Sequence, residues 1–405
     1  MTSTDISAPP VPRPGSPELV EFLAEVAADA QRRRAEGGSE PPNRALAQLR
    51  ALRLGAVRVP VEFGGGGWSV RELFDLLIDL GEADPDVPHI LRIHFGFVEE
   101  VFARPRTTRK DAWLPEVVEG RIFGGALTEL SDKNVGAYDY ESTLTPHPDG
   151  GYRLDGRKFY STGSRFADFV RVAARLPDGS LLSAVVPADR AGVEHVDDWD
   201  GIGQRHTGSG TTILTNIVVA EEETLPYAGL EQGVKPRRAF PQLYLHALAA
   251  GILRSLVTDA AELLRSRTRT FVFANEQPRH DPQLLEVVGS LSAAAFAAET
   301  LVRAAAQAQE DSFAAARDTG YDVQLEEAAA IRAAQAKVAI EDFALRAAGR
   351  IFDLGGASAT RASAHLDRHW RNLRTLFSHN PALYKARALG DVVVNGATLP
   401  DAGHF

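Results

Sequence analysis

The sequence predicts an α+β protein in which a β-domain lies between two helical regions. Apolar residues recur at helical spacing before residue 121 and after residue 228, whereas the residues between them alternate in polarity or are β-branched. Turn pairs such as Asp149-Gly150 and Asp178-Gly179 separate the predicted strands. With 405 residues the chain is long enough for two or three domains. We therefore expect a helical domain at 1–120, a β-barrel or sandwich at 121–228 and a four-helix bundle at 229–405.

The first helical region contains two helix starts. Ser16-Pro17 precedes one apolar-periodic run, and Ser69 with Glu72 forms a capping-box pattern before another. Four glycines at 64–67 lie between these helices, but neither the Lys-Ser or Lys-Thr of a phosphate-binding loop nor the spacing of a dinucleotide-binding turn accompanies them. We interpret the glycines as a turn that needs backbone freedom.

The region after Pro236 returns to long, alanine-rich helical segments that end at Gly355-Gly356. Alanine favours helix and lets neighbouring helices approach closely, as in a bundle. The longest apolar stretch, Leu284 to Ala308, is interrupted by charged residues, so we expect a packed helix rather than a membrane span.

Composition excludes several classes of function. The chain has 54 acidic and 44 basic residues, a net charge of −10, which argues against nucleic-acid or anionic-membrane partners. It has no cysteine, so redox chemistry must come from a bound cofactor. His365 and His369 are spaced like two metal ligands, but no third ligand stands out, and we expect no metal site. The first ten residues do not resemble a signal peptide, so we expect a cytoplasmic protein.

The order of the three regions and five short motifs resemble the acyl-CoA dehydrogenase fold over nearly the whole chain. The motifs are Pro60 to Gly65, Leu127 to Glu129, Phe159 to Gly163, Arg267 and Arg269 before Phe271, and Phe352 to Ala357. The resemblance implies that all but the first contact a flavin. The flavin contacts that it implies are Thr128, Ser161, Thr162, Ser164, Arg267, Arg269, Phe271, Gly355 and Gly356.

The resemblance fails at the position of the dehydrogenase base. A dehydrogenase of this fold needs a carboxylate to remove the α-proton of an acyl thioester. The C-terminal segment that carries this glutamate in the commonest members, 367–381, contains no glutamate. The alternative position, within 242–251, contains neither glutamate nor aspartate. Desaturation of an acyl-CoA is therefore disfavoured.

The same segment is similar to flavin-dependent monooxygenases built on this fold, of which dibenzothiophene monooxygenase is the familiar type. The match includes the run from Asp367 through His379-Asn380-Pro381 to Lys385, and His94-Phe95-Gly96-Phe97. It implies that His94 and His379 line the pocket over the flavin. It also implies a two-component enzyme, a homotetramer that takes reduced FMN or FAD, with FMN favoured, from a separate NAD(P)H:flavin reductase. Oxygen would react at the flavin C4a to give a hydroperoxyflavin that oxygenates a small apolar substrate at sulfur, nitrogen or an aromatic carbon.

The residue types suit that chemistry. An oxygenated flavin must be shielded from water, and histidine titrates near neutrality, so His94 and His379 can hydrogen-bond it or move a proton. Ser161 and Thr162 would contact the flavin N5 edge. Fixed cations must hold the phosphate, and Arg368 or Arg371 join Arg267 and Arg269 as candidates. Cysteine is absent and the single methionine is residue 1, so the interior offers an oxidant almost no sulfur.

Other interpretations remain open from the sequence. His94 can be a core histidine whose hydrogen bonds are satisfied, His379 a helix cap, the arginines a solvated helix end, and Ser161 and Thr162 ordinary strand residues. An acyl-CoA dehydrogenase or oxidase with another base is the alternative function, and a non-enzymatic flavin-binding relative is the third. The substrate is not defined by the sequence, although 240–246 and 377–384 are expected to line its pocket.

Overall fold

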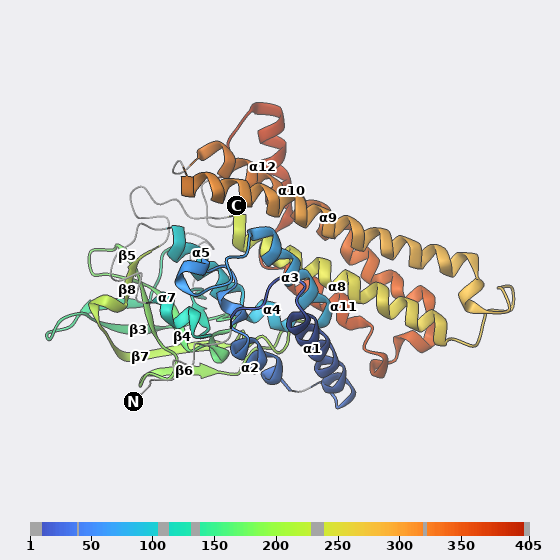
Figure 1. Ribbon diagram of the computed structural model, residues 1–405, viewed down its shortest axis with the longest axis horizontal. Helices are drawn as coiled ribbons and strands as arrows, with labels where there is room; N and C mark the ends of the chain where they lie inside the picture. The colour runs from blue at the N-terminus through green and yellow to red at the C-terminus, as the bar shows by residue number, and fades with distance from the viewer. Residues whose placement is uncertain are drawn as a thin grey trace, which may run out of the picture.

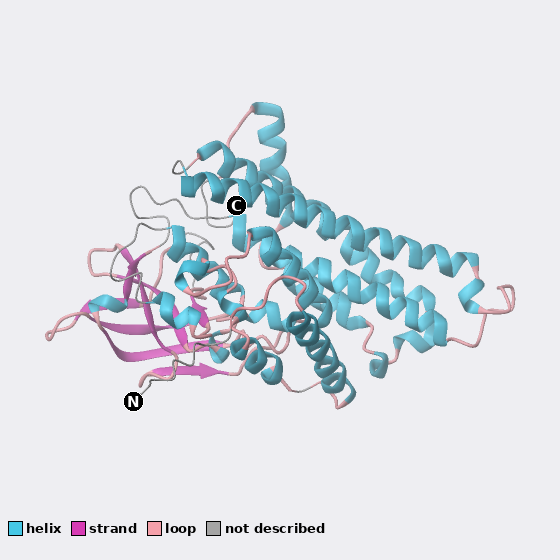
Figure 2. Ribbon diagram, in the orientation of Figure 1, coloured by secondary structure: helices cyan, strands magenta, loops and turns pink. Residues whose placement is uncertain are grey.

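The computed structural model describes residues 10–38, 40–103, 113–130, 138–227, 239–318 and 322–400. A helical N-terminal region, a β-sheet and a long helical C-terminal region follow one another along the chain (Figures 1 and 2). The sheet lies at one end of the longest axis and the tips of the longest helices at the other. The predicted fold class is confirmed.

The N-terminal helices begin where the sequence predicted. Ser16 caps α1 by accepting a hydrogen bond from the Leu19 amide at 3.4 Å. Ser69 and Glu72 form both bonds of a capping box at the start of α3. The helices are α1 (Pro17–Ala35), α2 (Asn43–Ala51), α3 (Val70–Ala83), α4 (Asp86–Ile90), α5 (Arg92–Ala103) and α7 (Trp113–Val118), with 3₁₀ turns at Leu54–Ala56 and Val61–Phe63.

The four glycines form a tight turn, as predicted. Gly64 and Gly67 have positive φ angles of 84° and 64°, which favour glycine. A Cβ atom on Gly65 would lie 2.2 Å from the carbonyl oxygen of Val59, so a side chain has no room there.

The middle region forms one mixed sheet in the order β6-β7-β3-β2-β4-β5-β8, with β1 added parallel to β4. A separate apolar core underlies it, with Leu144, Leu154, Val172 and Ile217 fully buried. The strands are β1 (Phe123–Ala126), β2 (Thr143–Pro146), β3 (Tyr152–Lys158), β4 (Phe169–Arg175), β5 (Leu181–Pro187), β6 (Val193–Val196), β7 (Thr211–Val219) and β8 (Thr224–Pro226).

The C-terminal helices pack closely on one another and on α3. At the crossing of α3 and α8, Gly81 and Gly251 allow the two backbones to touch, because a Cβ on Gly251 would lie 2.3 Å from the Ile78 carbonyl oxygen. Arg254 joins three helices by contacting Asp79 at 2.7 Å and Glu299 at 2.8 Å. The helices are α8 (Ala239–Ser266), α9 (Pro282–Asp318), α10 (Val323–Arg350), α11 (Asp367–Phe377) and α12 (Ala382–Asn395), with 3₁₀ turns between α10 and α11.

One helix in the described part of the chain, Pro282–Ala315 within α9, is long and apolar enough to cross a membrane by length and composition. In this structure it packs against α8 and α10, and 28% of its most apolar window is buried within the chain.

Candidate active site

The α4–α5 segment joins the sheet to the bundle and positions the candidate site. At its start, Nδ1 of His89 lies 2.8 Å from Oε1 of Gln204 in the β-domain. A Cβ on Gly163 would lie 2.3 Å from the Ile90 carbonyl oxygen, so the two backbones are in close contact. On its other side, Arg92 donates from Nε to the Pro241 carbonyl at the start of α8, at 3.3 Å.

Two of the predicted flavin motifs lie side by side in the β-domain. Thr128 and Phe159 form an antiparallel bridge in which the Phe159 amide donates to the Thr128 carbonyl at 2.8 Å. The Thr128 side chain is exposed. The bridge therefore places Thr128 next to the turn that carries Ser161 and Thr162.

The hydroxyls of this turn differ in what they can offer a ligand. Thr162 Oγ1 lies 2.7 Å from Ser209 Oγ, which in turn lies 2.7 Å from Thr207 Oγ1. The Thr162 hydroxyl is therefore part of a series of hydrogen bonds within the protein. Ser161 Oγ is buried and has no hydrogen-bond partner among the described residues. The same holds for Ser164 Oγ. A buried hydroxyl without a partner is costly, and a bound group that accepts its hydrogen bond removes that cost.

His94 lies in the core. Its Nε2 is 2.9 Å from the Gly55 carbonyl oxygen, and its Nδ1 accepts from the Phe123 amide at 3.2 Å. Burial lowers the pKa of this imidazole to about 4. Both ring nitrogens are thus occupied by backbone groups, which fixes one neutral tautomer. This is the geometry of a satisfied core histidine, one of the two interpretations that the sequence left open.

His379 has different surroundings. Its side chain is exposed in this chain, and its Nε2 lies 2.9 Å from Nη1 of Arg92. Next to it, Asn380 is buried and donates from Nδ2 to Oε1 of Gln242 at 2.5 Å. Burial lowers the pKa of Arg92 to about 10, so it remains a cation near neutrality. Residues from α5, α8 and the segment after α11 therefore meet at His379.

His246 extends this cluster into the interior of the bundle. It lies one helical turn after Gln242 on α8, and its ring is edge-on to Phe377 with centroids 6.2 Å apart. Neither ring nitrogen has a hydrogen-bond partner among the described residues. Burial, reinforced by nearby Lys337 and Lys385, lowers its pKa well below the usual value. A neutral imidazole thus lies unpaired beside the predicted pocket.

We did not predict Arg92, Gln242, His246 or Asn380 as site residues from the sequence. The last three lie within the two segments that were expected to line the pocket, 240–246 and 377–384. The signal in the sequence that could have identified these residues is the presence of polar side chains within otherwise apolar helical segments. None of the four, nor His379, is a carboxylate. This composition disfavours the alternative function, which needs an acidic base at the flavin.

The remaining predicted contacts lie elsewhere in the chain. Arg267 donates to the Leu354 carbonyl, so it lies beside the turn that carries Gly355 and Gly356. Arg269 is exposed, and 69% of the Phe271 side chain is exposed. The α8–α9 connection that carries them is at the end of the long axis opposite the sheet (Figure 1). One chain therefore does not bring these residues to Ser161.

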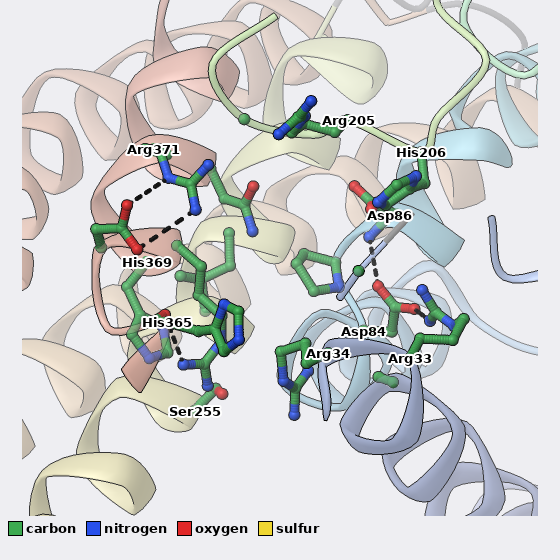
Figure 3. A pocket seen from close by; sticks show the side chains of 18 of the residues that line it. Arg33, Arg34, Asp84, Asp86, Arg205, His206, Ser255, His365, His369 and Arg371 are labelled. Atoms are coloured by element: carbon green, nitrogen blue, oxygen red, sulfur yellow. Dashed lines mark hydrogen bonds and ion pairs between the residues drawn. The ribbon is translucent and has the colours of Figure 1, made fainter. Parts of the chain in front are cut away.

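Arg368 and Arg371 occupy a third location, at the start of α11. Arg368 is ion-paired with Asp259 and donates to the His365 carbonyl at 3.1 Å. Arg371 is ion-paired with Asp367, with Nε to Oδ2 at 2.9 Å. Both line a cavity that Ser161 and Thr128 do not line (Figure 3).

Comparison with known proteins identifies the family to which the chain belongs. Residues 17–121 match the family described as acyl-CoA dehydrogenase, N-terminal domain, and residues 243–382 match acyl-CoA dehydrogenase, C-terminal domain. Dibenzothiophene monooxygenase from Mycolicibacterium goodii is 30% identical over 374 residues, which cover 89% of this chain and 88% of that protein. The chain belongs to the dibenzothiophene monooxygenase family. The family prediction from the sequence is confirmed, and the protein is an oxidoreductase of the flavin-dependent monooxygenase class.

Two further relatives match the present chain over almost its whole length. The probable FMNH2-dependent monooxygenase SfnC from Pseudomonas putida is 27% identical over 396 residues, covering 95% of each chain. The crystal structure of FMN-bound TdsC from Paenibacillus sp. A11-2 superposes with a TM-score of 0.87 at 26% identity, covering 96% of this chain and 99% of that one.

Proposed function

We propose that this dibenzothiophene monooxygenase family member uses reduced FMN and O2 to oxygenate a small apolar molecule at sulfur, nitrogen or an aromatic carbon. Reduced FMN would come from a separate NAD(P)H:flavin reductase. The observation that carries the proposal is the buried Ser161 hydroxyl, which has no partner among the described residues, together with the polar cluster around His379, which contains no carboxylate. FMN is the cofactor named for the SfnC and TdsC relatives.

The residues present fit a flavin. When bound, FMN supplies the chemistry that activates O2. Ser161, as the free donor, would hydrogen-bond the flavin ring, while Thr162 holds the turn in shape through Ser209. Thr128 would contact the other edge of the ring, and Ser164 offers a second unpartnered hydroxyl near the first.

His379 is the group that we assign to proton transfer. Arg92 can only donate hydrogen bonds, so the Nε2 atom that it contacts must be the acceptor, and His379 is held neutral in that geometry. A neutral imidazole can take up a proton from substrate or water and return it. Buried Phe377 and the first turns of α8 would exclude water from this side of the site. His94 has no free ring nitrogen for this work.

The flavin phosphate requires residues from a second copy of the chain. Arg267, Arg269 and Phe271 are remote from Ser161 within one chain, although the sequence assigned all of them to the flavin. We propose a homotetramer in which Arg267 of the partner subunit, with its neighbouring loop and glycine turn, reaches the site of the first. Exposed aromatic side chains at 271 and 273 are available for such contacts. We also propose a cytoplasmic location without nucleic-acid or membrane partners. The excess of acidic over basic residues supports the absence of such partners.

The function is tested by reconstitution. The purified protein is combined with a flavin reductase, NADH, FMN and a panel of thioether, amine and phenol substrates that includes dibenzothiophene. We expect mass spectrometry to find one atom of ¹⁸O from ¹⁸O₂ in a product, only when the reductase is present. Ser161→Ala should reduce product formation. Bleaching of bound flavin by an acyl-CoA, with no oxygenated product from any substrate, would instead support the dehydrogenase alternative.

A further inference from the structure

A cavity of about 420 Å³ lies where α1, the end of α3, the loop at 202–206 and the start of α11 meet. Figure 3 shows basic side chains around it: His365, His369 and Arg371 on one side, Arg33 and His206 on the other, and Arg205 and Arg34 at opposite rims. The function proposed above does not use this cavity, although Arg368 and Arg371, which the sequence indicated as candidates for the flavin phosphate, line it.

Most charges around the cavity are already neutralised. Arg33 is ion-paired with Asp84 and with Asp29, whose Oδ2 lies 2.9 Å from its Nε. Arg368 and Arg371 are paired with Asp259 and Asp367. On the α3 side, Glu82 is 3.5 Å from Arg254. Each of these carboxylates at the cavity wall therefore contacts a cation, and Glu82 shares Arg254 with Asp79 and Glu299.

Two guanidinium groups remain without a partner. Among the described residues, neither Arg34 nor Arg205 makes a hydrogen bond or an ion pair through its side chain. Arg34 is half-buried, and its pKa is lowered by burial and by the neighbouring charge of Arg368. Asp84 and Asp259 also act on Arg34, but no described carboxylate contacts Arg34 or Arg205 directly, so an anion in the cavity would stabilise both groups.

Asp86 adds a donor rather than a negative charge. It is only 8% exposed, and its Oδ1 has no hydrogen-bond partner in the part of the chain that the structure describes. Burial and the charge of Asp84 raise its pKa to about 8, so the carboxyl group carries a proton near neutral pH. A buried carboxylic acid at the cavity wall can donate to an anion oxygen.

We propose that this cavity binds a phosphate group, attracted by the guanidinium groups of Arg34 and Arg205 and hydrogen-bonded by Asp86. A phosphate carries up to two negative charges and several acceptor oxygens, and the planar guanidinium fork matches them. The volume exceeds that of phosphate alone, so a small phosphate ester fits as well as the free ion. Thr128, Ser161 and Ser164 do not line the cavity, which separates it from the proposed flavin ring site.

The test measures binding of inorganic phosphate to the full-length protein by isothermal titration calorimetry, with chloride at equal ionic strength as the reference. The variants are Arg34→Gln, Arg205→Gln and the double substitution. Arg44→Gln is the matched control, because Arg44 is a surface residue outside the cavity with 65% of its side chain exposed. Circular dichroism and thermal unfolding establish that each variant is folded.

We expect one phosphate per chain, affinity about tenfold weaker in each single variant, no measurable binding in the double variant, and unchanged binding in Arg44→Gln. Phosphate binding no tighter than chloride, or equal binding in the wild type and the double variant, would overturn the proposal. Glycerol phosphate in place of free phosphate distinguishes an ester from the ion.

A parallel titration with FMN and riboflavin separates this site from the flavin site. If the double variant weakens FMN but not riboflavin, and phosphate competes with FMN, the cavity holds the flavin phosphate and the proposal of a second site is wrong. We expect FMN affinity to be unchanged in the double variant. Because the readout is phosphate binding, it is independent of whether the enzyme oxygenates any substrate.

Discussion

The Nη1 atom of Arg92 lies 2.9 Å from Nε2 of His379, which joins the first residue of α5 to the segment after α11. Arg92 is also anchored to the Pro241 carbonyl at the start of α8. Three elements that are far apart in the sequence thus fix the position of one imidazole. The contact also determines its chemistry, because a guanidinium that donates to Nε2 favours the neutral ring.

Replacement of Arg92 is expected to change how activity depends on pH. In Arg92→Gln the positive charge beside His379 is lost, so the imidazole becomes easier to protonate and the acidic limb of the kcat profile moves to higher pH. We expect kcat at the optimum to fall about tenfold as the ring loses its fixed position. Arg346→Gln, in an exposed pair with Asp342, is the control. An unchanged profile would argue against coupling between Arg92 and His379.

Ser161 and Thr162 are expected to respond differently to loss of their hydroxyls. Ser161→Ala removes no hydrogen bond to any described residue, so stability should change little while FMN affinity falls about tenfold. Thr162→Ala removes the hydrogen bond to Ser209 and should lower the free energy of unfolding by about 1 kcal/mol. Fluorescence titration with FMN and urea unfolding provide the two measurements. Equal effects on both quantities would contradict the distinction.

His94 is expected to contribute to stability. In His94→Leu the Phe123 amide and the Gly55 carbonyl lose their partner in the core, which should cost about 2 kcal/mol or more. Urea unfolding measures this cost, and KM for substrate should be close to that of the wild type in the folded fraction. A variant with unchanged stability and no activity would instead favour the role over the flavin that the sequence resemblance implied.

Asp86 gives a pH dependence of stability whose sign follows from its pKa. Its folded-state value, about 8, is raised from 3.8, so between these pH values the unfolded chain loses this proton and the folded chain keeps it. The free energy of unfolding should therefore fall as pH rises through this window. Asp86→Asn cannot ionise and should be more stable near pH 7 by at least about 1.4 kcal/mol, the equivalent of one pKa unit. Urea unfolding should show this difference vanishing near pH 4, and a difference that is constant with pH would contradict it.

Much of the fold could be predicted from the sequence because its signals are local. The capping box at Ser69, the glycine turn at 64–67 and the alternation of the strands depend on neighbours a few residues away. The order of the regions and the short motifs were sufficient to predict the protein family. The missing carboxylate base, read from two short segments, was sufficient to turn the functional prediction from desaturation to oxygenation.

The tertiary structure decided what each candidate side chain can do. Whether a hydroxyl is hydrogen-bonded depends on the residues that fold against it. Thr162 is hydrogen-bonded to Ser209, whereas Ser161 has no partner among the residues that the structure describes. His94 and His379 looked equivalent as motif residues, yet packing buries both nitrogens of one and leaves the other beside Arg92. The sequence by itself thus determined the architecture and the class of enzyme. Burial and hydrogen-bond partnership, which depend on contacts between distant segments, were determined only when the chain was folded.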